Sequence, residues 1–118
     1  MQREDEVRLR HMLDAAKEAV EFSSGKTREE LDPDRMLVLA LVKSIEIVGE
    51  AATKVSPEAR SLLPSIPWPA VVTMRHRLIH AYYDMDLDRV WETITEDLPP
   101  LILALEKVLS SVAFAPRI

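Results

Sequence analysis

The chain of 118 residues contains no cysteine, only two glycines and few aromatic residues, which make up 5% of the sequence. Without cysteine it can form no disulfide framework, no thiolate nucleophile and no cysteine-ligated metal centre. Two glycines are too few for a turn-rich β sandwich or for a glycine-rich phosphate loop. These absences argue against disulfide-rich folds and β sandwiches, and they are compatible with a reducing cytosol.

Long apolar runs and an excess of positive charge are also missing. The most apolar run, residues 36–42, is far too short to span a membrane. No apolar stretch follows a basic segment at the N-terminus, as a secretory signal requires. We therefore expect a soluble, cytoplasmic protein with no membrane partner. The net charge of -5 argues against a broad nucleic-acid surface, and no DNA partner is expected, but a small basic site remains possible.

The apolar residues recur with helical spacing along nearly the whole chain, and the length fits one domain, residues 1–118, with a single core. The predicted helices cover approximately residues 5–22, 33–54, 69–83 and 87–112, with a short helix starting at Ser56. No alternating run is long enough for a strand. The sequence therefore predicts an all-α, up-and-down bundle of four to five helices.

Prolines and aspartates set two of the predicted boundaries. Asp32 is the predicted N-cap of the second helix, with Pro33 in the first helical position. Pro99 and Pro100 must end or kink the last helix, because the residue before a proline is pushed out of helical geometry. Residues 36–42 are apolar almost all round, so we expect burial on more than one side, in the bundle core or at a subunit interface.

The second helix also carries one polar stripe, at positions i, i+3, i+7 and i+11. Its members are Lys43, Glu46, Glu50 and Lys54. We interpret this stripe as a solvated face that contains a Glu50–Lys54 ion pair. The two tryptophans, Trp68 and Trp91, are interpreted as core or interface anchors rather than as stacking platforms for bases.

The most informative segment gathers two arginines, two histidines and a tyrosine within little over two helical turns. These residues are Arg75, His76, Arg77, His80 and Tyr82. A guanidinium offers two parallel donors to phosphate oxygens, and an imidazole can take or give a proton at neutral pH. A phenol can position a phosphate or stack on a base. The segment is compatible with metal-independent transesterification of RNA, in which the 2′-OH is the nucleophile, although a helix with these residue types is more often a polar face without chemistry.

The geometry of a straight helix does not bring the two key side chains together well. His80 lies about 140° around the axis from Arg75, at 100° a residue. Either the long arginine side chain curls round the helix, or the working site combines two subunits. A symmetric dimer with its two-fold axis beside this helix would set both copies of the segment in one cleft.

Arg75, His80 and Tyr82 have the spacing Arg-x4-His-x-Tyr, which resembles the signature of the HEPN superfamily. The chain is specifically similar to the HepT-like toxins that are paired with minimal nucleotidyltransferase antitoxins. The similarity extends over about residues 45–102. It includes flanking segments at residues 47–52, 66–68, 90–91 and 97–99.

The resemblance implies a HEPN-like bundle, a homodimer with both motifs facing a shared cleft, and endoribonuclease activity on an RNA substrate without a cofactor. By the same resemblance, Arg75 and His80 are the catalytic pair. Tyr82 is the residue that the nucleotidyltransferase antitoxin modifies with AMP, in a homodimer or a larger toxin–antitoxin assembly. A bulky anion on Tyr82 would block the cleft and repel the RNA phosphate.

The chain departs from the family pattern directly after the arginine, where His76 replaces the usual asparagine. This leaves open whether His76 or His80 is the base, although a supporting role as an orienting hydrogen-bond partner is our interpretation of His76. His76, His80 and Asp84 also have metal-ligand spacing on a helix, which would suit a metal-dependent hydrolase. No fourth ligand is evident in the sequence, so no metal is predicted.

A different class of function is a non-catalytic helical module. Such a module would bind a nucleotidyltransferase partner or a nucleotide, and the motif would merely hold an anion. The net charge of -5 supports this alternative, because an RNA-cleaving enzyme usually displays more positive surface.

Overall fold

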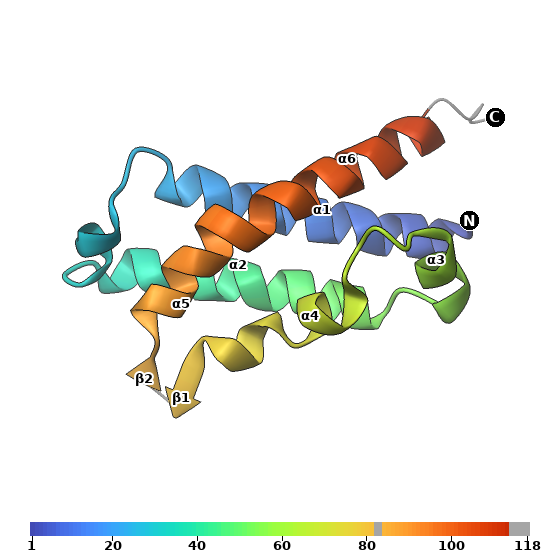
Figure 1. Ribbon diagram of the computed structural model, residues 1–118. Coiled ribbons are helices and arrows are strands. Elements are labelled where there is room, and N and C mark those ends of the chain that lie inside the picture. Colours follow the sequence, from blue (N-terminus) through green and yellow to red (C-terminus); the bar gives the residue numbers. More distant parts are fainter. Residues whose placement is uncertain (82–83, 114–118) are drawn as a thin grey trace.

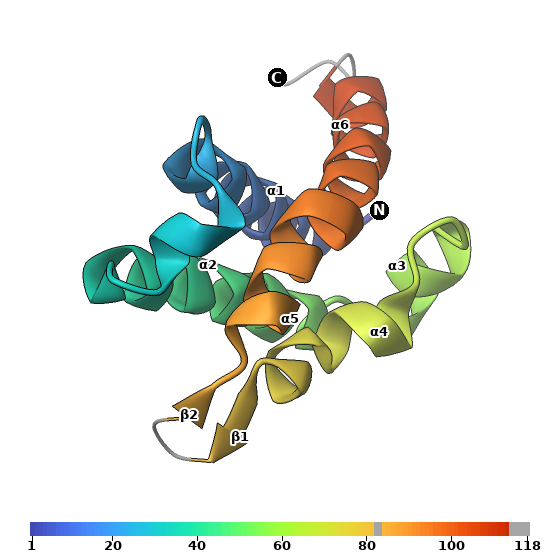
Figure 2. The same ribbon diagram turned by 60° about the vertical axis from the view of Figure 1, so that its left-hand side comes forward.

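Three long helices form the body of the molecule (Figure 1). The computed structural model describes residues 1–81 and 84–113, and only the backbone of residues 79–81 and 112–113. The long helices are α1 (Arg3–Ser23), α2 (Arg35–Thr53) and α6 (Leu98–Ala113). α1 and α2 run antiparallel along each other, and α6 packs against α1 (Figures 1 and 2). The predicted all-α, up-and-down bundle is confirmed.

Short elements connect the long helices. The short helices are α3 (Pro57–Leu62), α4 (Trp68–Val72) and α5 (Leu87–Glu92). Two 3₁₀ turns are η1 (Arg28–Leu31) and η2 (Met74–Arg77), and one π-helical turn is η3 (Thr93–Asp97). Two short strands are β1 (Ile79–Ala81) and β2 (Asp84–Met85). None of the helices in the described part of the chain combines the length and the apolar character that a membrane span requires.

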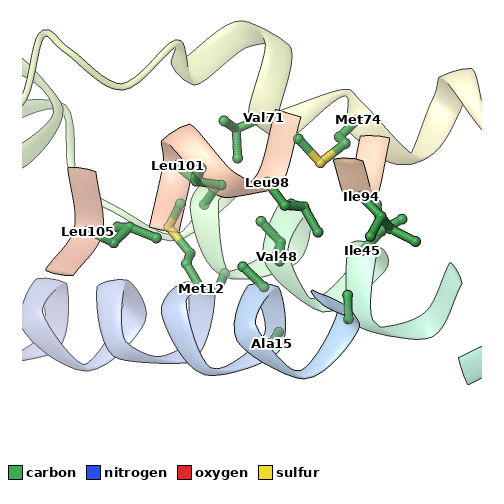
Figure 3. Packing of buried hydrophobic residues seen from close by; sticks show 14 of the residues in the cluster. Met12, Ala15, Ile45, Val48, Val71, Met74, Ile94, Leu98, Leu101 and Leu105 are labelled. Atoms are coloured by element: carbon green, nitrogen blue, oxygen red, sulfur yellow. The ribbon is translucent and has the colours of Figure 1, made fainter. Parts of the chain in front are cut away.

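One apolar core joins the long helices to the connecting elements. In Figure 3 the side chains of Met12, Val48 and Leu105 lie together between α1, α2 and α6. Val71 and Met74 reach the same core from the segment that follows α3, and they are 1% and 2% exposed. Burial of such side chains contributes about 1.5–3 kcal/mol each. The segment that carries the arginine and histidine cluster is therefore fixed to the core.

The N-terminus of α2 lies two residues later than the sequence predicts. Asp34, not Asp32, is the N-cap, since its carboxylate accepts a hydrogen bond from the Leu37 amide at 3.0 Å. Asp32 instead accepts a hydrogen bond from the Arg28 guanidinium at 3.3 Å. Both aspartates have capping chemistry, and the prediction chose the wrong one because the turn before α2 extends past the proline.

The apolar start of α2 is buried on one face only within a single chain. Val38 and Leu41 belong to the core, whereas Met36 is 84% exposed and Leu39 is 44% exposed. The bundle core therefore does not explain the almost all-round apolar character of residues 36–42. A subunit interface stays a prediction.

The helix predicted for residues 69–83 is wrong. The helical segment stops at Val72, a 3₁₀ turn follows, and the chain then enters a two-stranded hairpin in which Ile79 pairs with Met85. The Asp86 amide donates a hydrogen bond to the Leu78 carbonyl at 2.7 Å and closes the hairpin. A helix through this region would lose that closure, and Leu78 is fully buried where the chain turns.

The two prolines were predicted to end or kink the last helix, and they do not end it. Pro99 and Pro100 lie in the first turn of α6, which continues to Ala113. The π-helical turn η3 directly precedes them and separates α5 from α6. The predicted single helix over residues 87–112 is therefore a succession of three helical elements, α5, η3 and α6, of which the middle one is π-helical.

A buried carboxylate fixes the N-terminal end of α1 to the start of α3. Asp5 is 5% exposed and accepts hydrogen bonds from the Ser56 amide at 2.8 Å and the Ser56 hydroxyl at 2.7 Å. The Ser56 hydroxyl oxygen in turn accepts from the Ala59 amide and caps α3. The hydrogen bond from the Ser56 amide, followed by the one from its hydroxyl, lowers the pKa of Asp5 below its ordinary value of 3.8.

We expect Asp5→Ala to lower the free energy of unfolding by about 2 kcal/mol at pH 7, because hydrogen bonds to a charged group are lost. A carboxyl whose pKa is lowered by folding stabilises the native state above its ordinary pKa, and this contribution disappears as the pH falls through the lowered value. Urea unfolding of both proteins at pH 7 and near pH 3 measures the difference. A gap between them that does not narrow in acid would contradict this role of Asp5.

Candidate active site

An open hollow lies between the middle of α2 and the segment formed by α4 and η2. Its volume is about 380 Å³. The residues that line it are Lys43, Glu46, Gly49, Glu50, Thr53, Val72, Arg75 and His76. It brings the first two members of the arginine and histidine cluster against the polar stripe of α2. The sequence did not predict this contact.

The short η2 turn presents its polar side chains because its apolar ones are anchored. Val71, Met74 and Leu78 are buried in the core, while Arg75 and His76 are exposed. In a 3₁₀ turn successive side chains are about 120° apart, so one side chain points into the core and its neighbours fan out around the turn. The local sequence therefore fixes which residues face the solvent.

Gly49 allows α4 to approach α2 closely at the floor of the hollow. A Cβ atom at this position would lie 3.4 Å from the backbone oxygens of both Val71 and Val72. That distance is van der Waals contact, so α4 lies as near to α2 at this point as a Cβ atom would comfortably allow. The close approach brings the turn that carries Arg75 within reach of α2.

Arg75 is held by a carboxylate from α2. Its Nε forms an ion pair with Oε1 of Glu46 at 2.6 Å. The Arg75 side chain is 49% exposed and the Glu46 side chain 27% exposed, so the arginine reaches outward from a more enclosed acid. Among the described residues Glu46 is the one ion-pair partner of Arg75, and a guanidinium has five N–H donors for further contacts.

The polar stripe of α2 is not simply a solvated face. Lys43, Glu46 and Glu50 line the hollow opposite Arg75 and His76. The predicted Glu50–Lys54 ion pair is absent from the ion pairs formed by the described residues. The spacing of the stripe indicated a common face correctly, but the element that this face meets lies about 30 residues further along the chain.

Arg77 does not join this hollow, although it is only two residues from Arg75. It lines a different, mainly apolar pocket between α4 and α6, together with Glu96 and Asp97. Its Nη2 donates to the Ala70 carbonyl at 3.4 Å. The two arginines of the segment therefore serve different surfaces.

His80 lies in strand β1, directly after the η2 turn that carries Arg75. The two residues consequently belong to different elements, and the 140° separation expected on one straight helix does not apply. The His80 side chain and the whole of Tyr82 fall outside the described residues. Asp84 lies in β2, so the helical ligand spacing with His76 and His80 that motivated a metal site is lost as well.

Comparison with known proteins identifies the family. The family described as ribonuclease HepT-like matches residues 12–108, which include α2, the whole hollow and most of α6. A protein of Thermococcus cleftensis named "Probable ribonuclease HepT" is 35% identical over 100 residues, which cover 81% of this chain and 91% of the relative. The chain therefore belongs to the HepT-like ribonuclease family.

Other relatives carry the same kind of name. A Caldanaerobacter subterraneus protein named as an RNase is 33% identical over 86% of this chain and 90% of its own length. A Methanocaldococcus jannaschii protein, also named as an RNase, is 30% identical over 85% of this chain and 92% of its own length. No solved structure matches this chain. The predicted resemblance to HepT-like proteins is confirmed.

Proposed function

We propose that this chain is an endoribonuclease that cleaves RNA by metal-independent transesterification, with Arg75 and His80 as its catalytic pair. The observation that carries the proposal is the placement of Arg75. In a chain of a ribonuclease family, its half-exposed guanidinium lines an open hollow, and His80 lies in the next element.

The chemistry needs only groups that RNA and these residues supply. The neutral His80 imidazole takes the proton of the 2′-OH, the O2′–P bond forms, and the P–O5′ bond breaks. The departing O5′ takes a proton from an imidazolium or from water, and a 2′,3′-cyclic phosphate remains. Arg75 stabilises the charge that grows on the phosphate oxygens in the transition state. His76, at the wall of the same hollow, supports this arrangement as an orienting partner.

The active form is proposed to be a homodimer in which two such hollows share one cleft. The exposed Met36 and Leu39 support an assembly, because isolated chains rarely leave large apolar side chains of one helix in water together. A second copy could cover them across a two-fold axis. Analytical sedimentation at micromolar concentration measures the oligomeric state. A monomer under conditions where RNA is cleaved would contradict the proposed homodimer.

The partner that controls the activity is proposed to be a minimal nucleotidyltransferase antitoxin that transfers AMP to Tyr82. Tyr82 follows His80 by two residues, so a phosphate there adds negative charge beside the catalytic imidazole. This charge would repel the RNA backbone. Coexpression with a minimal nucleotidyltransferase should add the mass of AMP to the chain, and Tyr82→Phe should remove the addition.

The proposed reaction is tested with an RNA oligonucleotide in the presence of a metal chelator. We expect cleavage to continue in chelator and to yield a 2′,3′-cyclic phosphate end. Replacing the 2′-OH at the cleaved position by hydrogen should abolish the cut there, because the internal nucleophile is missing. Cleavage of the 2′-deoxy position at an unchanged rate would rule out transesterification. Absence of any cleavage would favour the non-catalytic binding module.

A further inference from the structure

We infer that Glu46 is a positioning residue for catalysis, which holds the Arg75 guanidinium where it stabilises the charge that grows on the phosphate in the transition state. The inference rests on the proposed function of Arg75. Glu46 comes from the middle of α2, and its Oε1 forms an ion pair with Arg75 Nε at 2.6 Å across the hollow. This is the shortest ion pair among those of the described residues.

The atom that Glu46 contacts decides its role. A guanidinium has five N–H donors in a rigid planar fork. An acid beside Nε anchors the inner part of the fork and leaves the terminal Nη1 and Nη2 edge outside this contact. That edge is the one that binds two phosphate oxygens in parallel. Glu46 therefore orients the arginine without occupying the donors that the substrate needs.

Glu46 is also the more rigid of the two partners. Its neighbours Ile45 and Val48 are fully buried, so the backbone of α2 is fixed at this point. Arg75 lies on a short 3₁₀ turn, and its side chain is half exposed. A free arginine side chain loses rotamer entropy when it is ordered, and a preorganised site avoids this loss in the transition state.

Two other roles for this carboxylate lead to different results. A purely structural ion pair on the surface contributes little to stability, so its loss would change neither the fold nor the rate much. A blocking acid would compete with phosphate for the arginine, and its removal would speed cleavage. Only a positioning acid makes cleavage slow while folding and substrate affinity stay nearly unchanged.

The experiment compares the steady-state kinetics of Glu46→Ala and Glu46→Gln with those of wild type, with RNA in excess over the protein. We expect Glu46→Ala to lower kcat about tenfold to a hundredfold, because a misplaced catalytic group costs up to about a hundredfold, with KM changed by less than about threefold. Glu46→Gln keeps the side-chain volume and a carbonyl oxygen that can accept from Nε, so it should recover kcat to within about fivefold of wild type.

Glu92→Ala is the matched control. It removes a comparable exposed pair, Glu92 with Arg89 at 3.6 Å, on α5 and away from the hollow. Circular dichroism and the unfolding midpoint verify that all variants fold. Wild-type or higher kcat in Glu46→Ala would overturn the inference, and so would a loss of equal size in Glu46→Gln. If Arg75→Ala itself cleaves normally, it is the proposed function of Arg75 that fails.

Discussion

Alanine at position 75 or at position 80 is expected to lower the rate of RNA cleavage by about a thousandfold while the protein stays folded. Removing one donor that stabilises transition-state charge costs about 10²–10³ in kcat, and general acid–base catalysis contributes about 10²–10⁴. Arg75 is half exposed and lies on a short 3₁₀ turn, so its truncation leaves the core intact, and His80 lies in the short strand β1. Cleavage of a labelled RNA in chelator, together with the unfolding midpoint, measures both effects.

The chain offers matched controls for both substitutions. Arg77→Ala removes the same charge two residues from Arg75, but Arg77 lines a different pocket, so cleavage should fall by less than about threefold. His76→Asn restores the residue that the resembled family usually has and should keep most of the activity. If His76→Asn abolishes cleavage while His80→Ala does not, His76 is the catalytic residue and His80 the supporting one. Equal cleavage by wild type, Arg75→Ala and His80→Ala would contradict the catalytic pair.

The long helices could be predicted because their signal is local and repeated. α1, α2 and α6 bury residues at helical spacing, and aspartate, proline and serine mark several boundaries. Even here, the choice between Asp32 and Asp34 as the N-cap needed the actual path of the preceding turn. A single aspartate reaches the Leu37 amide, and the sequence does not say which one.

The hairpin could not be predicted because its stabilisation is not local. Residues 75–83 have a composition that suits a helix, and β1 and β2 are too short to show alternation. What ends the helix is the burial of Leu78 together with the hydrogen bond from the Asp86 amide to the Leu78 carbonyl, eight residues apart. Such a contact overrides the local helix propensity of the segment.

The sequence predicted the residue types of the site, but it did not predict that a polar face of α2 forms the opposite wall of the hollow. The Arg-x4-His-x-Tyr spacing pointed to Arg75 and His80, but Glu46 was interpreted as one member of a solvated stripe. The available signal was the periodicity of that stripe, which indicated a common face of α2. Its meaning depended on knowing that Gly49 lets α4 approach, and therefore on which element faces α2.

The second large effect is expected at Trp68, which connects the site segment to the end of α2. Trp68 is 7% exposed, and its Nε1 donates to the Leu63 carbonyl at 3.2 Å. The Arg60 guanidinium carbon lies 5.4 Å from the centre of its ring. Arg60 itself donates to the carbonyls of Ala52 and Val55, at 2.8 Å and 3.2 Å, and so satisfies the C-terminal end of α2. The prediction of Trp68 as a core anchor agrees with this burial.

Trp68→Ala should therefore lower the free energy of unfolding by about 3–5 kcal/mol, the usual loss for a buried large aromatic residue. Trp68→Phe keeps most of the buried area and loses one hydrogen bond, so about 1–2 kcal/mol is expected. Trp91→Ala is the control, because Trp91 is only partly buried and should cost less than Trp68→Ala. Urea unfolding at one fixed protein concentration, which removes any effect of assembly, measures all three.

Because α4 begins at Trp68, the alanine variant should also cleave RNA more slowly at temperatures where it is still folded. An unfolding midpoint equal to that of Trp91→Ala would show that the site segment is held by Val71, Met74 and Leu78 alone.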